Sequence, residues 1–232
     1  MDYPLKYWGD KAVQDFFCKT VDMKTTGYWS FSEKPVVPID QTDFVGTNFI
    51  ICYDTPTGLV PLMGYRSIEA TRCEYHRLNF PPKGILELNK VDTTVLDGIL
   101  SSARSQKRRV CYKSSWTKSE HCPKSKESSL FIRDLITTIA VNYMKDSGID
   151  EWLTCGTVKN KTDQYFTFLG MSKITPNFNN FGFFDNEIVM LHMKDSQLFT
   201  KEALEIAARL NSFWENKLVI GEQFGDDLSI AA

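Results

Sequence analysis

The chain has 232 residues, of which 42% are hydrophobic and 24% are charged, and this composition excludes a disordered or fibrous protein. Lys and Arg number 27 against 29 Asp and Glu, so the net charge of −2 excludes a histone-like polycation but leaves room for a local basic patch. The six cysteines contain no close C-x-x-C pair, and no apolar stretch approaches the ~18 residues that a membrane-spanning helix needs. We therefore expect free thiols, no membrane span and a cytoplasmic location.

The first half of the chain predicts a helix followed by a long hairpin. Apolar residues at helical spacing predict the helix over Leu5–Met23, and residues 25–40 are expected to be irregular because they include two prolines. Two extended runs, Thr47–Tyr53 and Leu59–Ala70, flank the turn sequence Asp-Thr-Pro-Thr-Gly. Strand, turn and strand in this order indicate an antiparallel hairpin.

The rest of the chain alternates between helices and strands. The clearest helix has apolar residues every three or four positions from Ile132 to Met144. We predict an insert that opens at Pro81 with a short helix near Thr94–Arg104, then a strand over Arg109–Trp116. The clearest helix is expected to be capped by Ser128 or Ser129 and to end at Gly148. After it we predict, in chain order, a strand over Glu151–Val158, a short helix from an Asn160 cap through Phe168 to Gly170, a strand over Glu187–Met193 and a terminal helix over Thr200–Trp214. A mixed sheet flanked by helices belongs to the α/β (α+β mixed) class and is neither a barrel nor a bundle.

Several residues of the first half stand at spacings that resemble a known family. They are Trp29, the run Asp40-Gln41-Thr42-Asp43, Gly64-Tyr65-Arg66 in the second hairpin strand, and Phe80-Pro81. A Trp, a D-x-x-D, a G-x-R and an F-P in this order resemble the acyl-homoserine-lactone synthase (autoinducer synthase) family, which has the fold of the GNAT N-acyltransferases. The resemblance covers residues 5–82 by motif and residues 127–193 by the order of elements.

The sequence also departs from the family pattern. The family places an Arg and a Phe ahead of the Trp, where this chain offers Lys19 and Met23. The family's third strand carries an E-x-S-R motif, of which this chain keeps Ser114 but neither the Glu nor the Arg. Many GNAT enzymes carry a Tyr four residues before a helix-ending Gly, and that position is Phe166, with Tyr165 beside it. The chain thus resembles a divergent member of the family.

The resemblance implies a GNAT-like fold with a mixed, mostly antiparallel central sheet flanked by helices, in which two central strands part to admit the acyl donor. We expect residues 1–232 to form a single acyltransferase-like domain. Within it, residues 1–45 are expected to be a mobile segment on the acceptor side, and residues 195–232 a C-terminal helix and tail.

Asp40, Asp43 and Arg66 are the first candidates for a substrate site. Carboxylates in an irregular segment often cap turns, but Arg66 falls in an otherwise apolar strand, where an unpaired charge is costly. The resemblance implies that these residues order the N-terminal segment over the acceptor pocket, since a carboxylate and a guanidinium can orient each other through two hydrogen bonds. The aromatic candidates for the pocket wall are Trp29, Phe80 and Trp116, with core packing as the alternative for the first two.

The candidate catalytic residues are Glu69, Glu74 and Ser114. Acylation of an amine needs a deprotonated nitrogen, so a carboxylate near the donor carbonyl is a reasonable base, although surface exposure is the simpler interpretation of both glutamates. Ser114 stands in the strand where the family keeps its motif. Backbone N–H groups near residues 114–116 would stabilise the oxyanion of the tetrahedral intermediate.

Residues 101–126 carry eight basic side chains and one acidic side chain, Glu120. Such a run is usually a solvated face, but this one precedes the N-terminus of the clearest helix, where backbone N–H groups and the helix dipole favour phosphate. The spacing of His and Cys predicts no metal site. The candidate residues for binding the phosphates of the donor are Arg108, Arg109, Lys118, Lys124 and Lys126.

The leading hypothesis is an N-acyltransferase that moves a fatty-acyl group from an acyl carrier protein or acyl-CoA thioester to a small amine. The resemblance implies S-adenosylmethionine or an amino acid as the acceptor and no tightly bound cofactor, since the acyl-CoA or acyl-phosphopantetheine is a substrate. One alternative is a GNAT-like binding protein with altered catalysis. Another is a nucleic-acid-binding module that uses residues 101–126, which the net charge of −2 disfavours, so no nucleic-acid partner is expected.

Overall fold

One mixed sheet organises the protein. The computed structural model describes residues 1–29, 39–56, 58–180 and 186–220, and in these residues the sheet has seven strands in the order β1-β2-β3-β4-β7-β5, with β6 also paired to β7. β3 and β4 run parallel and the other paired strands run antiparallel, which confirms the expected mixed, mostly antiparallel sheet. The strands are β1 (Thr47–Thr55), β2 (Gly58–Glu69), β3 (Val110–Lys118), β4 (Glu151–Thr157), β5 (Ser172–Lys173), β6 (Phe178–Asn179) and β7 (Glu187–Met193).

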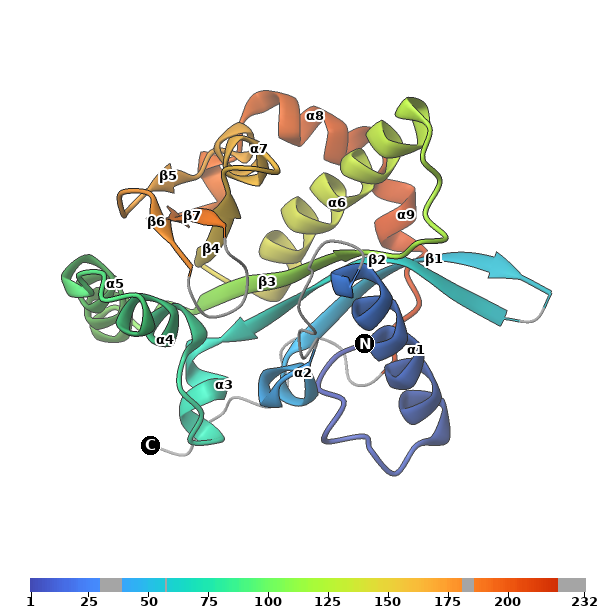
Figure 1. The fold of residues 1–232 in the computed structure, drawn as a ribbon, viewed down its shortest axis with the longest axis horizontal. Helices are drawn as coiled ribbons and strands as arrows, with labels where there is room; N and C mark the ends of the chain where they lie inside the picture. Colours follow the sequence, from blue (N-terminus) through green and yellow to red (C-terminus); the bar gives the residue numbers. More distant parts are fainter. Residues whose placement is uncertain (30–38, 57, 181–185, 221–232) are drawn as a thin grey trace.

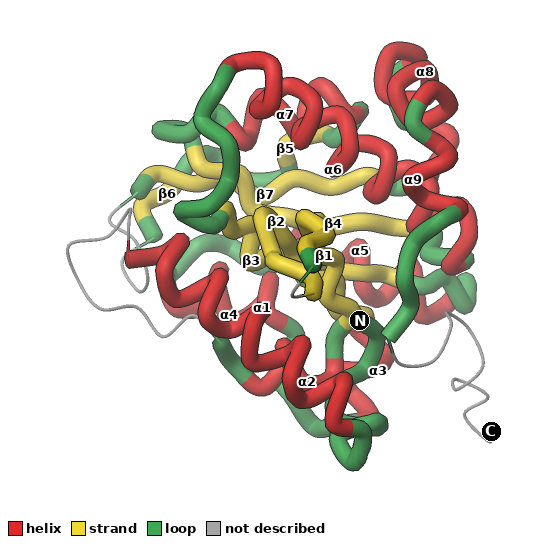
Figure 2. The backbone as a smooth tube through the Cα atoms, turned by 90° about the vertical axis from the view of Figure 1, so that its right-hand side faces the viewer, coloured by secondary structure: helices red, strands yellow, loops and turns green. Residues whose placement is uncertain are grey.

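Helices cover both faces of this sheet. Figure 1 shows α6, α7, α8 and α9 above the sheet and α1, α2 and α3 below it, and Figure 2 shows the same two layers from the side. The α-helices are α1 (Lys11–Trp29), α2 (Gln41–Val45), α3 (Ala70–Tyr75), α4 (Pro81–Leu88), α5 (Thr94–Ser105), α6 (Lys126–Ser147), α7 (Thr162–Leu169), α8 (Lys201–Arg209) and α9 (Asn211–Glu215), and a 3₁₀ turn covers Ser196–Leu198.

Each face of the sheet has its own hydrophobic core. On the α6 face, Trp152 packs with Ala140 and Met144 of α6. On the opposite face, Leu153 packs with Leu86 of α4 and with residues of α5. Trp152 and Leu153 are neighbours in β4 and both are fully buried, because successive strand residues point to opposite faces. β4 is therefore a central strand, covered on both sides.

The predicted hairpin and the predicted long helix are both confirmed. β1 and β2 pair from Thr47 opposite Ser67 to Thr55 opposite Gly58. α6 ends at Gly148, whose φ of 65° lies in the left-handed region that glycine tolerates. The prediction that Ser128 or Ser129 caps this helix is wrong, because the N-cap is Ser125.

The start of α6 is fixed by a side-chain cap that lies a few residues earlier. The Ser125 hydroxyl oxygen accepts a hydrogen bond from the Ser128 backbone N–H at 3.0 Å. The cap satisfies one of the backbone donors that the first helical turn leaves free, so the polar residues after it join the helix.

The first helix is shifted toward the C-terminus relative to its prediction. It begins after Asp10, whose carboxylate accepts from the Ala12 N–H at 2.8 Å, so the turns before it are not helical. It continues to Trp29, and in its last turns the Thr25 and Thr26 hydroxyls donate to backbone carbonyls of the preceding turn. Residues 30–38 of the segment expected to be irregular lie outside the described residues.

The C-terminal half differs from its prediction in two helix boundaries and two strands. α7 begins at Thr162 after Lys161, whose φ of 56° is left-handed, rather than after an Asn160 cap. The expected terminal helix breaks at Leu210 into α8 and α9. β5 and β6 were not predicted, because two-residue strands show no alternation in sequence.

Candidate active site

β3 and β4 pair for only part of their length. The parallel register runs from Val110 opposite Glu151 to Lys113 opposite Thr154. β3 then continues to Lys118 and β4 to Thr157 without a further paired residue between them. β2 and β7 remain paired to their outer sides, so both strands stay in the sheet. We call the part of the two strands beyond Lys113 and Thr154 the strand separation.

β3 bulges at the strand separation. Arg66 and Gly64 of β2 stand opposite Ser114 and Thr117, which leaves two β3 residues facing the single residue between them. One of the two, Ser115, has a φ of 57°. A bulge removes backbone groups from the ladder and turns them in a new direction. The backbone N–H groups at this point of β3 are thus candidates for contacts to a ligand.

On the α1 side of the strand separation, charged side chains from three elements meet. The Asp43 carboxylate forms ion pairs with Lys24 Nζ and with Arg66 Nη1, the latter at 2.9 Å. Arg66 Nη1 also contacts Asp40 Oδ1 at 2.9 Å, and Arg66 Nη2 donates to Ser114 Oγ at 3.1 Å. We call Lys24, Asp40, Asp43, Arg66 and Ser114 the ion cluster. It connects α1, the start of α2 and the bulged part of β3.

The two aspartates of the ion cluster also cap α2. Asp40 Oδ1 accepts from the Thr42 N–H at 2.7 Å, and Asp43 Oδ2 accepts from the Asp40 N–H at 2.9 Å, which is a reciprocal capping box. Turn capping and charge pairing were alternatives in the sequence, and the same oxygens do both. Burial alone would raise the pKa of Asp40, but Arg66 and the Thr42 hydrogen bonds together lower it. The carboxylate is therefore charged at neutral pH.

Lys24 belongs to the site although its sequence position was not singled out. Lys19 stands where the resembled family has an Arg, but Lys19 Nζ donates to the Leu59 carbonyl on the surface, at 3.2 Å. The Lys24 side chain is 1% exposed, and burial lowers its pKa while Asp43 acts in the opposite direction. Lys24 falls on the buried stripe of α1 that includes Phe17 and Thr20, so a lysine at helical spacing within an apolar face was the available signal.

Tyr28 lies beside the bulge of β3. Its hydroxyl hydrogen-bonds to Thr117 and Ser115, and burial raises its pKa, so it is a phenol with a proton to donate at neutral pH. α1 comes this close because of Gly27, where a Cβ would lie 2.4 Å from Thr117 Cγ2 and 2.7 Å from the Lys118 carbonyl oxygen. A glycine in a helix interior was the sequence signal for this approach.

The α6 side of the strand separation is aromatic. The half-buried Trp116 stacks on Tyr65 with 4.2 Å between ring centroids. Phe166 is buried in the core 5.4 Å from Trp116, and the Tyr165 hydroxyl is hydrogen-bonded to Thr137 Oγ1 at 3.0 Å. Burial raises the pKa of Tyr165, and the hydrogen bond to Thr137 acts in the opposite direction. The two residues at the position of the usual GNAT tyrosine are therefore part of the packing between α6 and α7.

The two glutamates considered as bases lie away from the strand separation. Glu69 accepts two hydrogen bonds from the Arg109 side chain, at 2.9 and 2.7 Å, beside the first residue of β3. Glu74 is exposed on α3 and pairs with Arg104. Because neither side chain reaches Ser114, we do not carry Glu69 or Glu74 into the proposed mechanism.

The other two aromatic candidates occupy different surroundings. Trp29 ends α1 and is 57% exposed. Phe80 immediately precedes α4 and packs edge-on against Tyr112, with 6.4 Å between centroids, in the core opposite α6. Phe80 thus has a packing role, whereas Trp29 remains available to a ligand.

The basic run of residues 101–126 divides into two groups. Arg108 and Arg109 precede β3 and are held by Glu151, at 3.0 Å, and by Glu69. The other candidates are at the far end of the strand, about 30 Å away for nine strand residues, so the two groups cannot share one phosphate. A continuous nucleic-acid surface is disfavoured for the same reason. The group around the α6 N-terminus consists of Lys118, Lys124 and Lys126.

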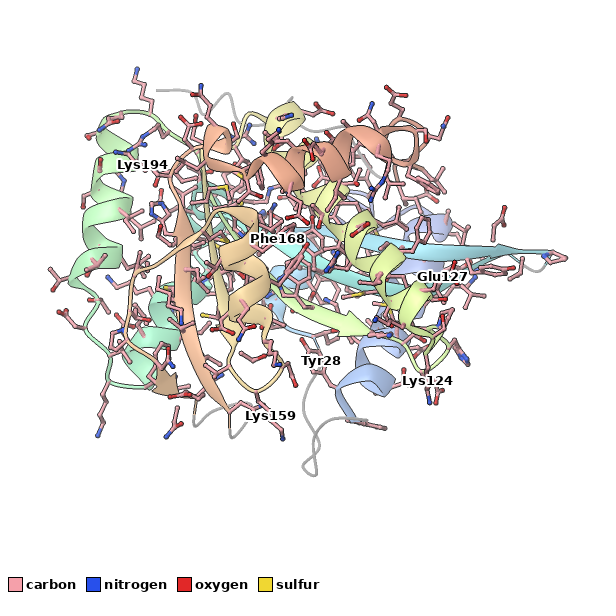
Figure 3. The ribbon with its side chains drawn as sticks, turned by 90° about the horizontal axis from the view of Figure 1, so that it is seen from above. Tyr28, Lys124, Glu127, Lys159, Phe168 and Lys194 are labelled. Carbon is pink, nitrogen blue, oxygen red and sulfur yellow. The ribbon has the colours of Figure 1, made fainter. Side chains whose placement is uncertain are left out.

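The strand separation opens toward this second group. In Figure 3, Lys124 at the start of α6, Tyr28 at the end of α1 and Lys159 after β4 lie along one edge of the molecule, and Lys194 lies at the opposite edge. Lys159 and Lys194 follow the ends of the antiparallel strands β4 and β7. A ligand bound along the strand separation would therefore place its charged end near Lys124.

A cavity of about 540 Å³ lies at a different place, between β1 and the inner side of α6. Its lining is mainly apolar and includes Phe49, Leu135 and Trp214. Phe49 stacks on Tyr65 at 4.9 Å, and Tyr65 stacks on Trp116, so aromatic rings separate the cavity from the strand separation.

No group of three or more His, Cys, Asp or Glu side chains in the part of the chain that the structure describes could hold a metal ion. No helix in the described ranges is long and apolar enough to cross a membrane.

Comparison with known proteins gives structural matches alone. No protein-family model matches the sequence, and no curated protein matches it. The structure is similar to the acyl-homoserine-lactone synthase LasI, with 14% identity, coverage of 81% of this chain and 87% of LasI, and a TM-score of 0.51. It also matches the CoA-dependent acyl-homoserine lactone synthase MesI (11% identity, 97% and 96% coverage, TM-score 0.48) and FeeM, an N-acyl amino acid synthase from uncultured soil microbes (13%, 79% and 91%, 0.45). The chain therefore has the GNAT-type fold of LasI, as its motifs predicted.

Proposed function

We propose that this protein is an N-acyltransferase that moves an acyl group from a phosphopantetheine thioester, on CoA or on a carrier protein, to a small amine. The strand separation carries this proposal. It offers unpaired backbone edges of β3 and β4 to an extended arm, and it lies between a polar face and an aromatic face. It also leads to the N-terminus of a 22-residue helix.

The donor is bound at its charged end by α6. Lys124 and Lys126 flank the Ser125 cap of α6, and Lys118 ends β3 just before it, where free backbone N–H groups and the helix dipole favour phosphate. From there the pantetheine arm follows the strand separation and brings the thioester carbonyl to the bulge at Ser115. The backbone N–H groups of the bulge stabilise the oxyanion.

The acceptor approaches from the ion cluster. The Asp40 side chain is 58% exposed while Arg66 is 3% exposed, so Asp40 is the charged group that an incoming amine meets. Ser114 Oγ accepts from Arg66, which leaves the serine proton free to donate to a substrate atom. Tyr28 stands at the bulge with its proton retained.

The amine attacks the thioester carbonyl directly, without an acyl-enzyme, and the tetrahedral intermediate then expels the thiolate. The amine nitrogen forms a C–N bond to the carbonyl carbon, and the C–S bond breaks. Tyr28 donates its proton to the leaving thiolate. The proton that leaves the amine nitrogen then passes through water to Tyr28 and restores the phenol. The motifs of the chain and the likeness to LasI, an acyl-homoserine-lactone synthase, favour S-adenosylmethionine or an amino acid as the acceptor.

The test measures thiol release from purified protein. Acetyl-, succinyl-, hexanoyl- and decanoyl-CoA and the same acyl groups on a carrier protein are offered with S-adenosylmethionine or each amino acid, and products are identified by mass spectrometry. We expect one donor class to be consumed with formation of an N-acyl product. Ser114→Ala should lower kcat/KM about tenfold or more, whereas exposed Ser105→Ala should not change it. Binding of thioesters without turnover would favour the catalytically altered binding protein, and no binding would refute the proposal.

A further inference from the structure

A fully buried lysine stands where the strand separation begins. Lys113 is the last β3 residue paired to β4, and its side chain points to the α6 face, opposite to that of Ser114. It is 0% exposed, and its Nζ lies 3.6 Å from the ring centroid of Trp152 and 5.3 Å from that of Tyr143. Among the described residues, Nζ has no hydrogen-bond partner.

Three further buried donors share this property and this neighbourhood. In the described part of the chain, Tyr65 Oη, Trp116 Nε1 and Trp152 Nε1 also lack a hydrogen-bond partner. Tyr65 stacks on Trp116, and Lys113 Nζ lies 5.9 Å from the Tyr65 ring and over the Trp152 ring. We call Tyr65, Lys113, Trp116 and Trp152 the donor cluster. A protonated lysine and two indoles can donate hydrogen bonds but cannot accept them.

The acidic residues of the flanking strands are engaged elsewhere. Glu69 of β2 binds Arg109, and Glu151 of β4 binds Arg108 and His192. Burial lowers the pKa of Lys113 to about 7, with Cys111 acting weakly in the opposite direction. The aromatic faces around the ammonium offset part of the cost of burying its charge, but they provide no acceptor for its protons. The fold thus gathers buried donors and provides no anion for them.

The chemistry of a ligand that completes this cluster follows from the count of donors. Unpaired buried donors are costly, so a ligand that binds here gains most by supplying acceptor oxygens. A carboxylate supplies two oxygens that together accept about four hydrogen bonds, and its charge matches Lys113. Lys113 precedes the bulge at Ser115 by two strand residues, or about 7 Å, so the carboxylate would lie a few carbons from the thioester carbonyl.

We propose that the acyl group transferred by this protein carries a carboxylate that Lys113 and its neighbours bind, so that the donor is a short dicarboxylic acid held as its monothioester. This inference rests on the proposed function and specifies its acyl group, in place of the fatty-acyl group that the sequence suggested. The distal carboxylate takes no part in the bond changes: the C–S bond breaks, the C–N bond forms and the thiolate takes up a proton. Lys113 is a specificity-determining residue and does not contact the reacting atoms.

The test compares donors that differ in one charged group. Dissociation constants for succinyl-CoA and glutaryl-CoA are measured by calorimetry against butyryl-CoA and valeryl-CoA, with acetoacetyl-CoA as a neutral oxygen-bearing donor. For the wild-type protein we expect the carboxyacyl donors to bind about tenfold tighter, as one charge-assisted pair allows. Lys113→Met should abolish this preference, while Lys201→Met, at a side chain that is 91% exposed, should keep it.

Each outcome separates the inference from the proposed function. Equal binding of butyryl- and succinyl-CoA, or a preference that Lys113→Met leaves intact, would overturn the carboxylate assignment but leave the acyltransferase proposal standing. Preference for acetoacetyl-CoA would overturn it in favour of a neutral oxygen. If no thioester binds, the proposed function itself fails. Folding of Lys113→Met is checked by urea unfolding, in which loss of an unpaired buried cation should raise the midpoint.

Discussion

At the strand separation, the two faces of the sheet differ in whether their buried cations have acidic partners. On the α1 face, Lys24 and Arg66 are matched by Asp40 and Asp43, and each group contacts a partner of opposite charge. On the α6 face, Lys113 is buried among aromatic rings without an acidic partner in the described residues. Buried charges persist when they are paired, whereas an unpaired one is retained at a cost to stability. On the α1 face the protein itself supplies the acidic partners, and on the α6 face, in our proposal, the ligand supplies the missing anion.

Removing the central acid of the ion cluster should have the largest effect. Asp43→Asn removes the carboxylate that pairs with the buried Lys24 and leaves the buried Arg66 with the exposed Asp40 alone of its two aspartates. We expect the free energy of unfolding to fall by about 3–5 kcal/mol, the cost of breaking a buried pair from one side. Urea unfolding at pH 7 measures it. Asp15→Asn, in an exposed pair with Lys11, is the control and should cost about 0.5 kcal/mol or less. If Asp43→Asn lowers the free energy of unfolding as little as Asp15→Asn does, the ion cluster is not paired as described.

On the α6 face, we expect a substitution at Lys113 to raise the free energy of unfolding. Lys113→Met keeps the length of the side chain and removes the unpaired charge, so the free energy of unfolding should rise by on the order of 3 kcal/mol at pH 7. Because the pKa of Lys113 is about 7 in the native protein and 10.5 when exposed, the unfolded chain binds the extra proton between these values. Wild-type stability therefore rises with pH over this interval, and the gain from the substitution shrinks toward pH 10. Urea unfolding from pH 7 to 10 checks this, with Lys201→Met as the invariant control.

A third prediction concerns how α1 approaches the ion-cluster face. Gly27→Ala would place a methyl 2.7 Å from the Lys118 carbonyl oxygen, so we expect a loss of about 1–3 kcal/mol as α1 is displaced. Gly98→Ala in α5 is the matched control, since no atom lies within 4 Å of the new Cβ. There, helix propensity alone should stabilise the protein by about 0.5–1 kcal/mol. Thermal unfolding should show a lower Tm for Gly27→Ala and a higher Tm for Gly98→Ala. If the Tm rises for both variants, α1 does not contact β3 at Gly27.

The smallest effect is expected at the exposed edge of the ion cluster. Asp40→Asn keeps a capping side chain on α2 but removes an ion pair whose acid is 58% exposed, so the loss should be about 1 kcal/mol or less at pH 7. Because the pKa of Asp40 is lowered in the native state, this contribution is present above pH 3.8 and is lost as the pH falls through the native pKa. Acid unfolding curves of wild type and variant should therefore converge at low pH. Curves that stay equally separated would exclude Asp40 as the titrating group.

Strong local patterns determined much of the fold. The hairpin over β1 and β2, the end of α6 at Gly148 and the strands β4 and β7 depend on periodicity and turn residues within a few positions. The same reasoning separates Glu69 from Arg66. Glu69 lies three residues after Arg66 in β2, and an odd separation in a strand places two side chains on opposite faces. It could not have served the acceptor side that Arg66 serves.

The sequence by itself determined that Asp40, Asp43 and Arg66 stand at motif spacing, and that a cationic run precedes the best helix. Only the tertiary structure decided which charges acquire partners. Lys24 reaches Asp43 from another helix, and Arg66 reaches Ser114 from 48 residues away. The same run that ends in exposed lysines at α6 contains Lys113, which strand alternation turns into the core. Pairing and burial depend on long-range contacts between elements, and local periodicity carries no information about them.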